Sequence, residues 1–199
     1  MREISNKVLN VGGGNKKFPL PSYYDGWEHI LLVLDLSGNP VLHMDAIDMV
    51  ELEPNQFDAI YCSNNLEHYY RADVKEVLKG MHHVLKENGF VEIMVPNIEE
   101  LIKLAYERGL DIDDILYEIE GFGPITVHDF IFGYEFTNDP IRRELGLHKT
   151  AFTQKSLEAY LKKNGFSFVY ARNEGLLIHM LGFKKKPGKL ERDCLGLTL

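Results

Sequence analysis

The most informative pattern in this chain is a run of glycines after one apolar segment and an acid after the next. Apolar residues 8–11 lead into glycines 12–14, and apolar residues 30–34 are followed by Asp35. Glycine lets the backbone approach a ligand where any Cβ would collide, and the acid can accept hydrogen bonds from both hydroxyls of a ribose. The pattern predicts a site for an adenosine-containing cofactor, although a glycine run alone also fits a plain tight turn.

The residues after the glycines separate two such cofactors. A dinucleotide needs a helix N-terminus at its pyrophosphate, but Pro19 and Pro21 disfavour a helix start at this point. S-adenosylmethionine carries a ribose and no phosphate, so it loses little when this helix is short or missing. The sequence therefore favours S-adenosylmethionine over NAD.

Composition and charge restrict the class of protein. The chain has 199 residues, 45% of them hydrophobic, and a formal net charge of −8, which predicts one globular domain and argues against nucleic acid as a partner. Cys62 and Cys194 belong to no metal-binding pattern, and such sparse cysteine fits a reducing compartment. The N-terminus lacks an apolar signal segment and no apolar run could cross a bilayer. We expect a cytoplasmic protein with no metal site and no membrane partner.

Short apolar runs bounded by Gly, Asn, Asp or Pro indicate the strands. Such runs are typical of buried parallel strands, which show no polar alternation. The predicted strands span residues 8–11, 30–34, 41–44, 57–62 and 90–95.

Apolar residues at helical spacing predict a helix over residues 74–85. Asp73 with Glu76 resembles a capping box, and residues 88–89, an Asn-Gly pair, supply the expected stop. A second capped helix is expected to begin near Thr153.

The last part of the fold is expected to be a hairpin. Strands over residues 166–171 and 176–183 are joined too closely for a crossover helix, so they should pair antiparallel. The predicted fold class is α/β: a Rossmann-like, mostly parallel sheet with helices on both faces and a terminal antiparallel hairpin.

In this order, the segments resemble the motifs of class I S-adenosylmethionine-dependent methyltransferases, specifically a small branch with a shortened first helix. The resemblance covers most of residues 7–183. Five ordered matches are more specific than any one of them. The matching segments are residues 9–14, 33–36, 43–46, 57–68 and the flanks of the fifth strand at 84–90 and 95–97.

The resemblance implies how the cofactor is held at the first two strands. Gly12 and Gly14 would bring backbone against its methionine and ribose parts, and Asp35 would bind the ribose hydroxyls. Physical reasoning agrees for Asp35, because an ionised carboxylate makes charge-assisted hydrogen bonds to a diol.

The resemblance also implies contacts from the third and fourth strands. Asp45 and Ala46 would contact the adenine, and the segment from Asn64 to Leu66 would contact the methionine side. Two of these residues have ordinary alternatives: Asp45 could be a turn residue or helix cap, and Asn64 a turn residue after a buried strand.

One segment is longer than the corresponding part of the family. Residues 97–150 form a lid-like insertion within a single domain over residues 1–183, and residues 184–199 form a C-terminal tail. Helices are expected near 101–106 and 112–119. Insertions over the carboxyl ends of the strands are where this fold builds substrate specificity.

Three histidines are candidates for a general base. Methyl transfer to a hydroxyl requires removal of a proton, and histidine is the side chain best suited to accept it at neutral pH. His68 follows the fourth strand, whereas His128 and His148 lie in the insertion. Packing is the alternative role for His68, and an exposed loop position is the alternative for the other two. We expect His68 to be the base.

The leading functional interpretation is methyl transfer to a small-molecule acceptor, such as a hydroxyl of a sugar or other metabolite. A non-catalytic subunit that binds S-adenosylmethionine or S-adenosylhomocysteine is an alternative. A protein acceptor also stays open, and a nicotinamide-dependent reductase is disfavoured by Pro19, Pro21 and the terminal hairpin. The acceptor and the oligomeric state cannot be read from the chain.

Asp35→Ala should weaken S-adenosylmethionine binding about tenfold or more, because loss of a charged hydrogen-bonding partner costs about 1.5–3 kcal/mol. Calorimetry on the folded variant measures this change. Unchanged affinity would remove Asp35 from the site, and equal or better binding of NADH would overturn the choice of cofactor.

Overall fold

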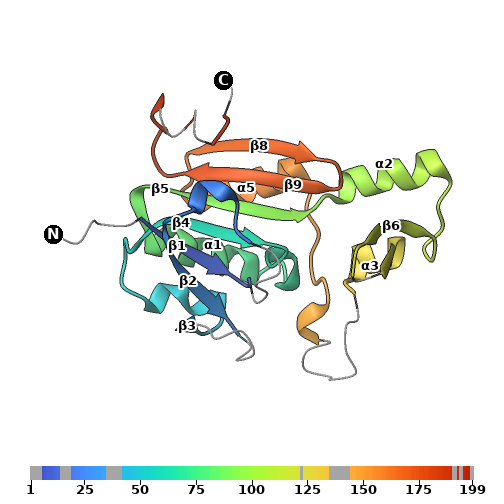
Figure 1. Ribbon diagram of the computed structural model, residues 1–199, viewed down its shortest axis with the longest axis horizontal. Helices are drawn as coiled ribbons and strands as arrows, with labels where there is room; N and C mark the ends of the chain where they lie inside the picture. The colour runs from blue at the N-terminus through green and yellow to red at the C-terminus, as the bar shows by residue number, and fades with distance from the viewer. Residues whose placement is uncertain are drawn as a thin grey trace.

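In the part of the chain that the computed structural model describes, a seven-stranded sheet forms the centre of the molecule (Figure 1). The described residues are 6–13, 19–34, 42–121, 123–134, 144–189, 192 and 195–197. The strand order is β3-β2-β1-β4-β5-β9-β8, and β9 runs antiparallel to both of its neighbours. The strands are β1 (Lys7–Val11), β2 (Glu28–Val33), β3 (Leu42–His43), β4 (Phe57–Ser63), β5 (Leu85–Pro96), β8 (Phe168–Glu174) and β9 (Leu177–Phe183).

The parallel strands β1 to β5 lie where the apolar runs predicted them. Such strands are covered on both faces, so consecutive side chains are buried. In β1, Val8 and Leu9 belong to different groups of core residues and both are completely buried. The hairpin of β8 and β9 is antiparallel, as predicted. The sheet therefore has the architecture expected from the sequence.

Helix α1 (Asp73–Val84) differs from its prediction at both ends. No side chain caps its first turn, so the predicted capping box of Asp73 and Glu76 is wrong. Asn88 and Gly89 lie inside β5 and do not stop the helix, which runs directly into the strand. A Cβ on Gly89 would lie 2.7 Å from the carbonyl oxygen of Asp58. This glycine therefore permits close approach of two strands, which is a different use of the same residue type.

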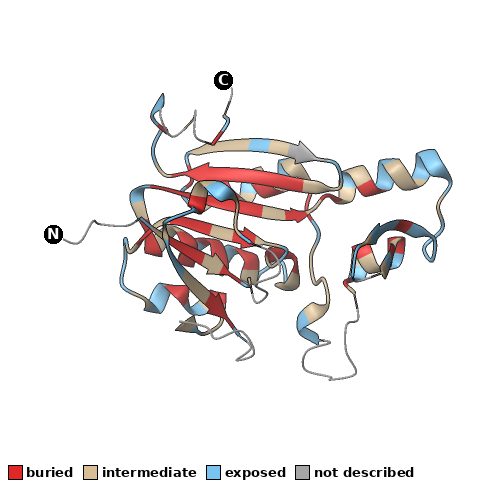
Figure 2. Ribbon diagram, in the orientation of Figure 1, coloured by how far each residue is buried: buried red, intermediate tan, exposed pale blue. Residues whose placement is uncertain are grey.

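One face of the sheet is covered by α1, by α5 (Gln154–Lys163) and by the 3-10 helix η3 (Ala46–Glu51). Their apolar sides meet the side chains of β1, β4 and β5 in the largest group of buried residues (Figure 2). Leu78 of α1 and Leu157 of α5 are completely buried in this core. Thr153 caps α5, so this helix begins where the sequence predicted.

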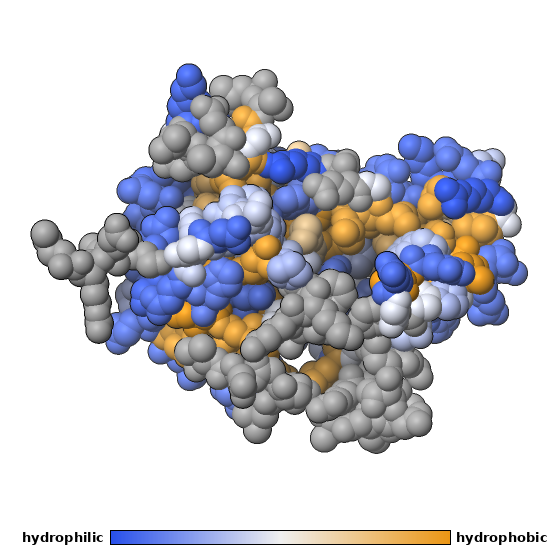
Figure 3. Space-filling view, viewed as in Figure 1, coloured by the Kyte–Doolittle hydropathy of each residue, from blue (hydrophilic) through white to orange (hydrophobic). Residues whose placement is uncertain are grey.

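The opposite face is covered by an aromatic segment that contains the short 3-10 helix η1 (Ser22–Tyr24). Tyr24 is completely buried, and its ring lies edge-on to Trp27 with the centroids 5.2 Å apart. Apolar side chains also reach the surface between the sheet and α2 (Ile98–Arg108), as Figure 3 shows. The aromatic residues near the N-terminus thus pack on the sheet in place of a long first helix.

A buried carboxylate fixes this aromatic segment to the sheet. Glu92 of β5 accepts hydrogen bonds from Tyr23 and Tyr24, the latter at 2.7 Å, and the Nε2 atom of His179 lies 2.7 Å from its Oε1 atom. Burial by itself would raise the pKa of Glu92, but the hydrogen bonds from His179, Tyr23 and Tyr24 outweigh it and lower the pKa. The network therefore satisfies a charge at the centre of the sheet.

The segment between β5 and α5 forms its own small core beside the sheet (Figure 1). It contains α2, the hairpin of β6 (Ile115–Ile119) and β7 (Gly123–Thr126), and α3 (Val127–Phe132). Helix α2 confirms the helix expected near 101–106, but the helix expected over 112–119 is wrong. Residues of β6 pair with β7, and only Leu116 among them is buried. The nearby partner strand decides the outcome, because an apolar run this short fits either element.

Leu78→Ala should destabilise the protein strongly. Leu78 is completely buried, and such a change costs about 2–5 kcal/mol through lost burial and the cavity left behind. Ile102→Ala is the matched control, because Ile102 lies on α2 with 64% of its surface exposed. Urea denaturation should give a change of less than about 0.5 kcal/mol for the control. Equal losses in the two variants would contradict this assignment of the core.

Candidate functional site

The predicted cofactor contacts gather at one edge of the sheet. In a parallel sheet the carboxyl ends of the strands share an edge, and ligands of open α/β folds bind there. Gly12 follows β1, Asp45 follows β3 and Asn64 follows β4. Gly14 and Asp35 lie outside the described residues, so their roles remain predictions.

Gly12 lies where β1, β2 and β4 end. Its φ is +78°, and its main-chain N–H donates to the carbonyl of Leu32 at 2.9 Å. A Cβ at this position would lie 2.2 Å from the Nδ2 atom of Asn65. Both the conformation and the space therefore require glycine, and the exposed backbone can be approached closely by a ligand.

Asp45 has a structural role whether or not a ligand binds. Its Oδ1 atom accepts hydrogen bonds from the main-chain N–H of Ile47 at 3.1 Å and from the hydroxyl of Tyr69 at 3.0 Å. It thereby caps η3 and fixes the segment after η4 (Leu66–His68). Ala46, the first residue of η3, is buried. The predicted adenine contacts of both residues remain predictions.

The loop after β4 combines an exposed and a buried residue. Asn64 has a φ of +47°, and its main-chain N–H donates to the carbonyl of Met94 at 2.9 Å. Leu66 is completely buried at the start of η4, so its predicted contact with the methionine part stays a prediction. Asn64 is exposed. The turn at Asn64 leads directly into η4.

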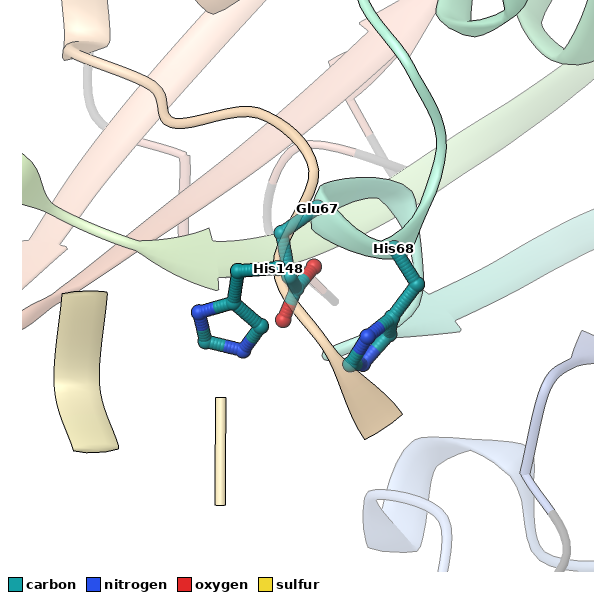
Figure 4. Close-up of side chains that lie close together, drawn as sticks. All are labelled: Glu67, His68 and His148. Atoms are coloured by element: carbon teal, nitrogen blue, oxygen red, sulfur yellow. The ribbon is translucent and has the colours of Figure 1, made fainter. Parts of the chain in front are cut away.

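Two of the three candidate histidines lie together. The rings of His68 and His148 have centroids 5.1 Å apart, although the residues are 80 positions apart in the chain (Figure 4). His128 is separate: its side chain is half exposed on α3, beside the ring of Phe132 and 3.9 Å from the Oδ1 atom of Asp129. The structure therefore favours His68 and His148 as the pair that shares a site.

Main-chain carbonyls orient both imidazoles in the same way. The Nδ1 atom of His68 lies 3.1 Å from the carbonyl oxygen of Leu147, and the Nδ1 atom of His148 lies 3.1 Å from that of Phe130. A carbonyl can only accept, so in each neutral ring Nδ1 carries the hydrogen and Nε2 carries the lone pair. The two Nε2 atoms are therefore the available acceptors.

Glu67 is the residue of this site that the sequence reasoning missed. Its side chain lies between the two histidines (Figure 4) and only 1% of the residue is exposed. Neither carboxylate oxygen has a hydrogen-bond partner among the described residues. Burial raises the pKa of Glu67 to about 8, against a smaller opposite effect of its own main-chain amide. An acid at a helix start is usually solvated, so this burial could not be predicted from the local sequence; only the position of Glu67 beside His68 pointed to the site.

The two imidazoles are uncharged at neutral pH. Burial lowers the pKa of His68. Burial, together with the nearby His68, lowers the pKa of His148 to about 4. Both rings can therefore act as acceptors of a proton or as ligands without first losing one.

Close main-chain contacts position His148. Gly133 has a φ of +92°, and a Cβ there would lie 2.2 Å from the carbonyl oxygen of Gly146. The main-chain N–H of His148 donates to the carbonyl of Phe132 at 2.9 Å. The next two amides, of Lys149 and Thr150, donate to the carbonyl of Glu67 at 2.8 and 3.1 Å. The end of the insertion is thus bound to α3 on one side and to η4 on the other.

A pocket opens beside this cluster. Glu67, His148 and Thr150 supply its polar groups, and Pro96, Ile98, Phe130 and Ile131 supply apolar walls. Most of these wall residues belong to the insertion. The site therefore combines two parts: a cofactor-type edge formed by the sheet, and an adjoining pocket closed by the insertion.

Comparison with known proteins matches this architecture. The family model described as "Methyltransferase domain" matches residues 25–93, and a search of curated proteins found no match. A SAM-dependent methyltransferase from Archaeoglobus fulgidus is similar in structure, with 15% identity, a TM-score of 0.60, and coverage of 90% of this chain and 86% of that chain. One from Methanosarcina mazei has 13% identity and a TM-score of 0.58, covering 92% and 95%.

A third similar structure carries ligands. It is the 1,6-didemethyltoxoflavin-N1-methyltransferase of Burkholderia thailandensis, solved with bound 1,6-didemethyltoxoflavin and S-adenosylhomocysteine. It has 16% identity and a TM-score of 0.53, and the match covers 92% of this chain and 72% of that chain. These likenesses confirm the predicted fold.

Gly133→Ala should destabilise the protein, because the added Cβ would collide with the main chain of Gly146 and overpacking costs about 1–3 kcal/mol. Gly109→Ala is the matched control: its φ is also positive, at +66°, but no described heavy atom lies within 4 Å of its Cβ position. Thermal unfolding of the two variants measures the difference. An equal effect in both would mean that backbone conformation alone, and not the close contact, matters at residue 133.

Proposed function

We propose that this chain, a class I S-adenosylmethionine-dependent methyltransferase by its fold and its family-model match, transfers a methyl group to a hydroxyl of a small-molecule acceptor. The observation that carries the proposal is the cluster of buried Glu67 with the partly buried His68 and His148, next to the loop after β4. It offers two acceptor nitrogens where a hydroxyl would have to lose its proton.

The described residues fit the cofactor. The side chain of Asn65 packs where a Cβ on Gly12 would lie, and the exposed backbone of Gly12 lies at the edge where ligands of such sheets bind. Gly12, Gly14 and the loop from Asn64 would hold the methionine part, and Asp35 the ribose. When bound, S-adenosylmethionine supplies an activated methyl group on a sulfonium. The task of the protein is to align the acceptor with that group, and positioning alone can contribute much of the rate.

The acceptor end of the site is the pocket beside the cluster. Pro96, Ile98, Phe130 and Ile131 supply its apolar walls, and Glu67, His148 and Thr150 supply its polar groups. The cavity itself is about 10 Å³, room for about one water-sized group, so it would receive the reacting hydroxyl and not the whole acceptor. His148 lines the cavity and His68 lies beside it, with ring centroids 5.1 Å apart, whereas His128 lies elsewhere on α3.

The surface properties support a small acceptor. The net charge of −8 disfavours a polyanionic partner. Among the described residues, no helix is both long and apolar enough to span a bilayer. The similar Burkholderia thailandensis enzyme was itself solved with a small molecule, 1,6-didemethyltoxoflavin, bound. The charge of this chain and that similar enzyme favour a metabolite over a nucleic acid.

Gly12→Ala should abolish binding of S-adenosylhomocysteine and methyl transfer. The Cβ would lie 2.2 Å from Asn65, which forces the loop out of position. Gly26→Ala is the matched control, because its φ of +82° is similar but no described atom lies within 4 Å of its Cβ position. Calorimetry with S-adenosylhomocysteine, and transfer of labelled methyl groups into pools of hydroxyl-bearing metabolites, are the measurements.

Two outcomes would contradict the proposal. Normal cofactor affinity in folded Gly12→Ala would place the cofactor elsewhere. Label that appears only in protein or nucleic acid, and in no metabolite pool, would exclude a small acceptor.

A further inference from the structure

The partly buried cluster beside η4 contains the elements of a metal site. Glu67, His68 and His148 each offer one ligand atom within 4.8 Å of the others. We propose that these three side chains bind a divalent transition-metal ion. The proposal departs from the expectation from the sequence, in which no metal site was predicted.

The histidines are already held as metal ligands usually are. Each donates its Nδ1–H to a main-chain carbonyl, His68 to Leu147 and His148 to Phe130, both at 3.1 Å. Such second partners fix the ring orientation and the tautomer of metal-bound histidines in other proteins. The Nε2 lone pairs are therefore left for the ion.

Glu67 provides the independent observation that a cation belongs here. It is buried, its two oxygens have no hydrogen-bond partner among the described residues, and it lies between the two imidazoles. An unpaired buried carboxylate is costly, because burial removes its hydration without replacement. A cation held by both histidines would stabilise the ionised carboxylate directly.

The ammonium group of Lys149, the nearby positive charge, does not lie between Glu67 and the two histidines. The Nζ atom of Lys149 lies 3.3 Å from Glu144 and 5.2 Å from the centre of the Tyr70 ring. Lys149 is thus engaged away from the carboxylate of Glu67, although its charge contributes to the lowered pKa of His68.

The ligand set specifies the class of ion. Two imidazole nitrogens and one carboxylate suit Zn²⁺ and other first-row transition metals, whereas Mg²⁺ and Ca²⁺ prefer oxygen ligands. Three protein ligands leave coordination positions open, as in catalytic sites. The adjoining pocket, with Glu67 and His148 in its wall, is where a further ligand would enter.

This metal site deepens the proposed function, and its catalytic role rests on that function. A hydroxyl at an open position has a lowered pKa. Its O–H bond breaks with the proton passing to solvent, the oxygen electron pair forms the new bond to the methyl carbon, and the S–CH₃ bond breaks to leave S-adenosylhomocysteine. His68 and His148 then act as ligands, and the ion replaces direct proton acceptance by histidine.

Titration of chelator-treated protein with Zn²⁺ tests the site without any acceptor. Wild type should bind one equivalent, and Co²⁺ should give a visible absorption spectrum with nitrogen and oxygen ligands. Glu67→Gln, His68→Ala and His148→Ala should each weaken Zn²⁺ binding by more than the roughly 10- to 100-fold that loss of an outer-shell partner costs. His128→Ala is the matched control and should bind Zn²⁺ as wild type does. Mg²⁺ and Ca²⁺ should not compete.

Thermal unfolding keeps the test valid for less stable variants, because an ion that binds only the folded state raises the melting temperature. Zn²⁺ should stabilise wild type and His128→Ala but none of the cluster variants. Absence of stoichiometric binding to wild type, or equal binding by folded cluster variants, would overturn the metal site. Binding of S-adenosylhomocysteine to metal-free protein separates the two proposals: if it fails while Zn²⁺ binds, the methyltransferase function falls and the metal site stands.

Discussion

The parallel pairing of β1 with β4 at the centre of the sheet is the constraint on which the functional regions depend. Their register runs from Val8 opposite Ala59 to Val11 opposite Cys62. Because the strands are parallel and in this register, β1 and β4 both end at the same edge of the sheet. Gly12 and Asn65 contact each other there. The loop of β4 then leads within a few residues to Glu67 and His68. A cofactor-type edge and a reactive cluster therefore follow from one pairing.

The insertion adds the third residue of the cluster, His148, to the two that follow β4. Its last described segment is bound to the carbonyl of Glu67 through the amides of Lys149 and Thr150, and this contact brings His148 to His68. Its apolar residues at 130–131 also form part of the pocket wall. The sheet thus positions Glu67 and His68, whereas the insertion adds His148 and part of the pocket wall.

The sequence predicted the parts of the structure that depend on local pattern. Buried strands appear as apolar runs, and the fold was recognisable from their order. The helix expected over 112–119 failed because β7 competes for the same short run. Glu67 was missed because its burial depends on a segment about 80 residues away in the chain. The proximity of His148 to His68 also depends on residues far apart in the chain. Three candidate histidines could therefore be predicted from the sequence, but which two lie together could not.

The contacts that position His148 are made by main-chain atoms: its own amide to Phe132, and the following two amides to Glu67. A main-chain hydrogen bond does not depend on which side chain its residue carries. Side chains at these positions can therefore change without moving His148, except at Gly133, where the close approach of Gly146 requires glycine. Under the proposed function, wall residues such as Ile98 and Ile131 are then the places where a substitution would alter the choice of acceptor while the cluster keeps its position.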